Sequence, residues 1–291
     1  MPAIDIRPAH ADDFAAVASF TLGTFSWGDY VADRFLEWLG DPNGKVVVAV
    51  DATDRPVGLL RAVMVSSEEC WLHAARVDPS VRRQGVGMRL NEAGVDWGRE
   101  RGALAVRLMV EQWNEPARHQ VEKLGYRHVA SWVRGSRPLP GSGSAPQGNG
   151  GRRVAAEERL HPADPSEVEP AYTAWTLSEL VKDAHGLYPI GWSWRAMRLT
   201  DVAAAAATGR LFQCSSGWVI LEPGDERSLH CPWLTTSPDG IDALIGAIVD
   251  RSRQVKVGLV TMMVPESAWV VGAMERSHFE LTPSAIYQKD L

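Results

Sequence analysis

The sequence is poor in several features that would indicate particular classes of protein. It contains three cysteines in 291 residues, Cys70, Cys214 and Cys231, and no two of them form a Cys-x-x-Cys pair. The spacing typical of zinc sites is therefore missing, and so is the basis for a disulfide framework. We expect free thiols and no bound metal.

Long apolar runs and an excess of positive charge are missing as well. No stretch has the length of a membrane-spanning helix, and the first residues lack the basic and then apolar layout of a signal peptide. The formal net charge is −6, whereas nucleic-acid-binding proteins usually carry a basic surface. These absences predict a cytoplasmic protein that binds neither membranes nor nucleic acid.

Apolar residues are abundant, and they fall into two segments. They make up 45% of the chain, which is enough to build sizeable cores. Residues 138–151 are rich in Gly, Ser and Pro and contain almost nothing that can be buried, which predicts a linker. Because each flanking segment has the usual size of a domain, we predict two domains, at 1–137 and 152–291.

The first segment alternates between strand and helix patterns. A strand near residues 4–8 and two helices are followed by three strands joined through short turns, which read as an antiparallel meander. A helix that begins at Val86 and ends near Gly102, a strand at Ala103–Val110, a helix and a last strand complete it. This order predicts an α+β fold, with a mixed, mostly antiparallel, twisted sheet flanked by helices.

The turn that opens the helix at Val86 is the most informative stretch. Gly85 and Gly87 let the backbone approach an anion, and the first N–H groups of the helix point toward it. Arg82 and Arg83 add charge-assisted donors. The pattern is neither a Walker loop nor a dinucleotide fingerprint. We predict a phosphate-binding turn, and the alternative is a solvated helix start.

Two motifs resemble those of a known family. The spacing Arg82-x-x-Gly85-x-Gly87 is similar to the Arg/Gln-x-x-Gly-x-Gly/Ala signature of the GCN5-related N-acetyltransferase (GNAT) superfamily. Residues 114–117 and 123–126 resemble its Asn-x-x-Ala and Lys-x-Gly-Phe/Tyr segment. The order of elements through residues 1–135 resembles the family as well.

The resemblance implies acetyl-CoA as the co-substrate. In the family the glycine turn holds the pyrophosphate, and two central strands splay apart to hold the pantetheine arm. An amide near Val77 is implied to support the thioester oxygen, and Asn114 to contact the arm. The residues assigned to acetyl-CoA in this way are Ala75, Arg76, Val77, Arg82, Arg83, Gln84, Gly85, Val86, Gly87 and Asn114.

The usual catalytic groups of the family are not in their places. The tyrosine expected seven residues after Asn114 is Val121, and the alternative glutamate position falls near Trp71. We expect the catalytic group to be Glu111, where the central strands separate, or His73. His73 shares a strand face with Val77 if no bulge intervenes, and its ordinary pKa suits proton transfer. Deprotonation of the amine by water remains an alternative.

The second segment repeats the first more faintly, with helices predicted at Glu167–Ala184 and Trp192–Ala207. The sequence of its last predicted strand, helix and turn, from Met262 to Phe279, parallels that of the first segment from Leu108 to Tyr126. This similarity indicates an internal duplication. The turn before Gly240 carries Asp239 where the first segment has arginine, and a carboxylate repels a diphosphate. We predict a degenerate second copy that does not bind acetyl-CoA and that covers or completes the substrate site.

These observations predict an acetyl-CoA-dependent N-acetyltransferase, a monomer or a homodimer. The acceptor is expected to be a primary amine of a small molecule, which attacks the thioester directly in a ternary complex. Trp27 and Tyr30, in the region of the first two helices, are candidate acceptor contacts. Two alternatives remain open: a non-catalytic acyl-CoA-binding or regulatory module, and acetylation of a protein amine.

Overall fold

The computed structural model describes residues 4–22, 24, 28–139, 158–224 and 227–291. Contacts divide the chain into two compact units. The first comprises residues 1–109, 116–128 and 287–291, and the second comprises residues 110–115 and 129–286. The boundaries that we predicted at residues 137 and 152 divide the chain into two continuous segments. The contacts, in contrast, place residues 287–291 in the first unit. Most of the expected linker, residues 140–151, lies outside the described residues.

The first unit is built on a mixed sheet with the strand order β1-β2-β3-β4-β5. Neighbouring strands are antiparallel except for β4 and β5, which are parallel. The predicted mixed, mostly antiparallel sheet is therefore confirmed. Its elements are β1 (Asp5–Pro8), α1 (Phe14–Thr21), α2 (Val31–Leu39), β2 (Gly44–Val50), β3 (Pro56–Met64), β4 (Glu69–Val77), α3 (Val86–Glu100), β5 (Ala105–Glu111) and α4 (Glu115–Lys123).

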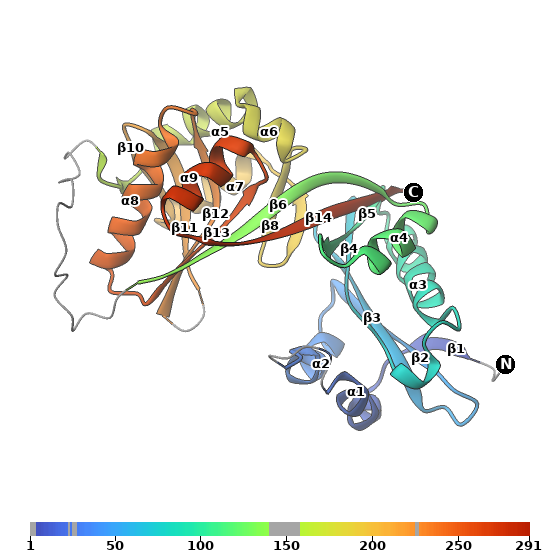
Figure 1. Ribbon diagram of the computed structural model, residues 1–291. Coiled ribbons are helices and arrows are strands. Elements are labelled where there is room, and N and C mark those ends of the chain that lie inside the picture. Colours follow the sequence, from blue (N-terminus) through green and yellow to red (C-terminus); the bar gives the residue numbers. More distant parts are fainter. Residues whose placement is uncertain (1–3, 23, 25–27, 140–157, 225–226) are drawn as a thin grey trace. The chain divides into compact units, whose positions relative to one another are not determined.

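Helices cover both faces of this sheet (Figure 1). On one face, α1 and α2 bury Val17, Phe35 and Trp38 against apolar side chains of β2 and β3. On the other face, α3 presents glycine to the strands. A Cβ on Gly98 would lie 3.0 Å from Cys70 Cβ. The absence of a side chain at this position lets α3 pack closely on the sheet.

The parallel pair β4–β5 separates soon after it begins. Pairing runs only from Glu69 with Ala105 to Trp71 with Arg107, so the rest of the two strands is splayed, as predicted. A bulge follows in β4, because Leu59 pairs with Arg76 whereas Arg61 pairs with His73.

Ala74, inside this bulge, has a φ of 56°. One extra residue reverses the alternation of side chains. The condition for His73 and Val77 to share a strand face is therefore not met.

The second unit has the strand order β14-β6-β13-β12-β11-β10-β7 and a separate hairpin of β8 and β9. The helix predicted at Trp192–Ala207 is wrong in its first part. Gly191, with a φ of 59°, turns the chain into the hairpin, and the helix begins only at Leu199. The elements are β6 (Arg127–Pro138), β7 (His161–Pro162), α5 (Val168–Leu177), α6 (Glu179–Asp183), β8 (Leu187–Ile190), β9 (Ser193–Ala196), α7 (Leu199–Ala207), β10 (Leu211–Cys214), β11 (Gly217–Pro223), β12 (Ser228–Thr236), α8 (Ile241–Gln254), β13 (Leu259–Pro265), α9 (Ala268–Arg276) and β14 (Glu280–Asp290).

The second unit repeats the plan of the first. Strands β12 and β13 are parallel and are connected by α8, as β4 and β5 are connected by α3. A register irregularity between Ile220 and Glu222 corresponds to the bulge opposite β3 in the first unit. The helix starts differ, however. Gly240 before α8 has a φ of −91°, whereas Gly85 before α3 has a φ of +79°. The second copy therefore keeps the topology and lacks the glycine turn.

Candidate functional site

The glycine turn lies where β4 leads into α3. After Val77 the chain makes one 3₁₀ turn (Pro79–Val81), and Arg83 and Gly85 then adopt left-handed conformations with φ of 62° and 79°. Gly85 caps α3 directly. By helix geometry, the N–H groups of the first turn of α3 have no partner within the helix. They are available to an anion at this end.

The charge around the turn suits an anionic ligand. Arg82, Arg83 and Gln84 are exposed, and within the described part of the chain neither arginine forms an ion pair. Asp78, which follows β4 directly before the turn, is engaged locally: its Oδ1 accepts bonds of 2.9 Å from Ser80 N and 2.7 Å from Ser80 Oγ. These bonds lower the pKa of Asp78. The two guanidinium groups are therefore not neutralised by the turn itself.

The sequence interpretation missed one residue beside the turn, Gln120 of α4. A Cβ on Gly87 would lie 3.1 Å from Gln120 Nε2 and 3.8 Å from a methyl group of Val77. Gly87 therefore leaves room for α4 to approach the start of α3. No motif pointed to Gln120, because the two helices meet only in the tertiary structure.

His73 lies in a cluster around Trp38. Its ring meets the indole edge-on at a centroid distance of 5.3 Å, and its Nε2 lies 3.3 Å from Arg61 Nη1. Arg61 also pairs with Asp41. Burial, and then the positive charges of Arg61, Arg76 and Arg34, lower the pKa of His73 to about 3. The ring is therefore neutral at neutral pH and a weak base.

Tyr30 joins the same cluster from the start of α2. Its ring packs against Trp38 at 6.0 Å and under the guanidinium of Arg76 at 5.7 Å. Arg76 in turn donates from Nε to Asp29 Oδ2 at 2.7 Å, and Asp29 Oδ1 accepts a bond from the Val31 amide. Tyr30 is thus held at a fixed place while part of its ring stays exposed. Trp27, the other predicted acceptor contact, lies outside the described residues.

The remaining candidates lie around the end of β5 and on α4. Glu111 is the last residue of β5, and its carbonyl accepts a bond of 2.9 Å from the amide of Asn114. By their contacts, both residues group with the second unit. Val121 is buried on α4. Tyr126 is buried too, its hydroxyl donates to Asn91 Oδ1 at 3.2 Å, and burial raises its pKa. Tyr126 therefore packs in the core of the first unit.

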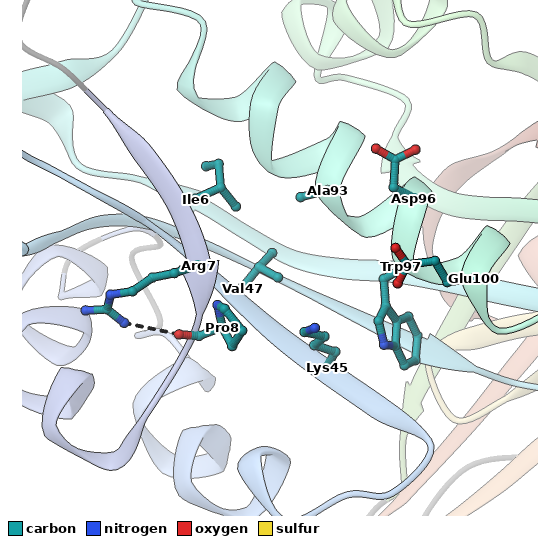
Figure 2. Close-up of a pocket in the computed structure, with 9 residues that line it drawn as sticks. All are labelled: Ile6, Arg7, Pro8, Lys45, Val47, Ala93, Asp96, Trp97 and Glu100. Atoms are coloured by element: carbon teal, nitrogen blue, oxygen red, sulfur yellow. Dashed lines mark hydrogen bonds between the residues drawn. The ribbon is translucent and has the colours of Figure 1, made fainter.

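A depression of about 180 Å³ lies on a different part of the first unit, between β1, β2 and α3 (Figure 2). Trp97 and Val47 form part of its lining, together with Lys45 and two carboxylates of α3. None of the predicted site residues takes part in it. Its lining consists of Ile6, Arg7, Pro8, Lys45, Val47, Ala93, Asp96, Trp97 and Glu100.

The described residues lack two features, a metal-binding cluster and a membrane-spanning helix. They contain no group of three or more His, Cys, Asp or Glu side chains that could hold a metal ion. Among the same residues, no helix combines the length and the apolar character needed to cross a bilayer.

Comparisons with known proteins agree with this geometry. A model of the acetyltransferase (GNAT) family matches residues 9–126. No match was found among curated protein sequences.

Solved structures resemble the whole chain. A GCN5-related N-acetyltransferase from Sphaerobacter thermophilus is 16% identical, with 99% of this chain and 95% of that chain covered and a TM-score of 0.64. One from Kribbella flavida is 14% identical, with coverages of 100% and 71% and a TM-score of 0.52. A GCN5-related glucosamine N-acetyltransferase region of a fungal GH3 β-N-acetylglucosaminidase is 16% identical, with coverages of 99% and 38% and a TM-score of 0.64. At these identities the similarity establishes the fold and not the substrate.

Proposed function

We propose, from the match of residues 9–126 to the acetyltransferase (GNAT) family, that the protein transfers the acetyl group of acetyl-CoA to a primary amine of a small molecule. The observation that carries the proposal is the glycine turn. It combines left-handed Gly85, the open end of α3 and two arginines, Arg82 and Arg83, that form no ion pair within the described residues. This set of donors fits a diphosphate.

The splayed strands β4 and β5 support the same proposal. Beyond Trp71 and Arg107 the two strands no longer pair, which leaves backbone groups free to bind the pantetheine arm. Val77 and its neighbours Ala75 and Arg76 lie at the end of β4, directly before the turn. An amide here would support the thioester oxygen as negative charge develops on it. The second unit, which lacks the turn, is proposed not to bind acetyl-CoA.

Proton transfer is assigned to Glu111 rather than His73. The lowered pKa of His73, about 3, makes its imidazole a poor base. Glu111 is half-buried, and within the described residues its carboxylate has no hydrogen-bond partner, so it is free to accept a proton. In this proposal Glu111 removes a proton from the ammonium. The neutral nitrogen then forms the N–C bond and the C–S bond breaks. The nitrogen gives up its second proton, and the thiolate takes up that proton, which leaves a neutral amide and the free thiol.

A test follows the free thiol of CoA across a panel of primary amines. We expect turnover with at least one small amine, and Glu111→Gln should lower kcat by about 10²-fold or more with little change in acetyl-CoA affinity. An unchanged kcat for Glu111→Gln would assign deprotonation to water. Turnover only with a peptide amine would contradict a small-molecule acceptor and favour the acetylation of a protein amine.

One observation favours a second candidate function, a non-catalytic acyl-CoA-binding module. The position that carries the usual tyrosine is Val121, which is buried on α4 and cannot donate a proton. Tight binding of acetyl-CoA in isothermal titration, together with no thiol release from any acceptor, would establish this candidate instead.

A further inference from the structure

The last five residues of the chain belong to the first unit. Tyr287–Leu291 group with residues 1–109 and 116–128, although most of the second unit stands between them in the sequence. They form the end of β14, which lies next to β5 in the strand order. Gln288 anchors this end, because its Oε1 accepts a bond of 2.6 Å from Arg107 Nε.

Arg107 is itself fixed in the sheet. Its Nη1 lies 2.5 Å from Glu69 Oε1, and both side chains are buried. Breaking a buried ion pair of this kind is costly, since it leaves an uncompensated charge. The end of β14 is thereby tied to the place where β4 and β5 pair.

The neighbours of Gln288 on either side contact α4. The hydroxyl of Tyr287 lies 3.1 Å from Arg118 Nε and 3.2 Å from Glu122 Oε1, one turn apart on the same face of the helix. Lys289 Nζ donates to the carbonyl of Leu124 at 2.9 Å, just beyond the last residue of α4. A cation at this end satisfies an unpaired carbonyl and complements the helix dipole. Together the two residues fix the rotation and the end of α4.

Helix α4 carries Gln120 to the glycine turn. The amide nitrogen of Gln120 is 3.1 Å from the position of a Cβ on Gly87, in the first turn of α3. Gln120 is exposed, and its amide has no hydrogen-bond partner in the part of the chain that the structure describes. An amide offers two N–H donors. The donor therefore lies beside Gly87, in the first turn of the helix whose N–H groups we assign to the diphosphate.

We propose that Gln120 is a further ligand of the diphosphate and that Tyr287 and Lys289 are positioning residues, which hold it in place through α4. This inference rests on the proposed binding of acetyl-CoA at the glycine turn. It assigns a role in cofactor binding to the end of the chain. In this proposal α4 holds a ligand of the diphosphate in place, in addition to packing against the rest of the first unit.

The test of Gln120 is a series of charges at this position in the full chain. Isothermal titration with CoA should rank the affinities as Gln120→Arg or wild type, then Gln120→Ala, then Gln120→Glu. The Ala variant should lose about tenfold, as expected for a bond to a charged group. Dephospho-CoA keeps the diphosphate and lacks the 3′-phosphate, so it should show the same fold-loss. Gln254→Ala, on an exposed position of α8, is the matched control and should bind like wild type.

Equal affinity of wild type and the three Gln120 variants would overturn the assignment of Gln120. A loss that appears only with CoA and not with dephospho-CoA would overturn it too, because it would place Gln120 on the 3′-phosphate. If wild type does not bind CoA, the proposed function fails, and that result is distinct from both.

Positioning is tested with Tyr287→Phe and Lys289→Met. Each should weaken CoA binding about three- to tenfold, Lys289→Arg should restore it, and Lys182→Met on an exposed position of α6 should have no effect. In a Gln120→Ala background both substitutions should cost little more, since residues that act through one group are not additive. A full additional loss in that background would show a general structural role and overturn the positioning role.

Discussion

At the scale of single residues, the glycine turn is defined by backbone conformation and by charge. Gly85 has a φ of +79°, a region that residues with a Cβ rarely adopt, although a Cβ there would meet no close neighbour. The constraint on Gly85 is therefore conformational and not one of space. Gly87 differs, because a Cβ there would press on Gln120.

Arg82→Ala and Gly85→Val should both weaken acetyl-CoA binding, for different reasons. The first removes one charge-assisted donor and should cost about 1.5–3 kcal/mol of binding free energy. The second forces a β-branched residue into a left-handed conformation and should displace the turn. Isothermal titration measures both. Arg210→Ala, in the second unit, is the control, and an affinity of Arg82→Ala equal to that of wild type would remove the phosphate assignment.

Two buried histidines, His73 and His230, should make the free energy of unfolding depend on pH. Burial lowers the pKa of His73 to about 3 and that of His230 to about 4, below the ordinary value of 6.5. At pH 5 the unfolded chain therefore binds more protons than the folded protein, so the free energy of unfolding falls as the pH drops below 6.5. The fall from pH 7.5 to pH 5 should reach up to about 2 kcal/mol for each histidine.

Urea unfolding of wild type and His73→Gln at both pH values tests this expectation. The difference in unfolding free energy between the two pH values should be smaller in the variant. An equal difference would show that His73 already titrates normally in the folded protein.

At the scale of elements, close packing of α3 depends on glycine. A Cβ on Gly94 would lie 2.8 Å from a methyl group of Leu60, and one on Gly98 would lie 3.0 Å from Cys70 Cβ. The sequence indicated the apolar face of this helix but not its separation from the sheet. That separation depends on which strand side chains lie opposite the glycines.

Gly98→Val should lower the free energy of unfolding by about 1–3 kcal/mol, because it overpacks α3 against β4. Gly246→Ala is the matched change, since Gly246 lies within α8 and a Cβ there meets nothing within 4 Å. It should raise stability by about 0.5–1 kcal/mol through helix propensity alone. Chemical denaturation measures both, and a neutral Gly98→Val would contradict the close approach.

At the scale of the whole molecule, the end of the chain completes the unit in which the chain begins. Leu291 N donates to Leu104 O at 2.9 Å, and Gln288 meets Arg107. A segment of residues 1–137 therefore lacks part of its own unit. The sequence suggested a division at residue 137 because composition changes there, whereas strand pairing is independent of composition.

A chain that ends at Ile286 should show faster amide hydrogen exchange in β5 and α4, because both lose partners from β14. Exchange in α8 serves as the internal control and should stay unchanged. The measurement is exchange followed by mass spectrometry of peptides. Unchanged protection of α4 would show that the end of β14 is dispensable for the first unit.

The sequence alone determined the local features of this protein. The mixed fold, the strands around the glycine turn and the start of α3 at Val86 follow from periodicity, from Gly85 and from the family resemblance, all of which are short-range signals. The hairpin at β8–β9 escaped prediction, because alternation over four residues is too short to outweigh a helical pattern around Trp192.

Only the tertiary structure decided the environments of the candidate residues. Burial, and then the positive charges of Arg61, Arg76 and Arg34, lower the pKa of His73. The return of β14 brings Tyr287 and Lys289 to α4. These features depend on contacts between residues far apart in the sequence. Sequence periodicity and motifs do not predict such contacts, because the burial of a side chain and its distance from other charges are defined only in the folded protein.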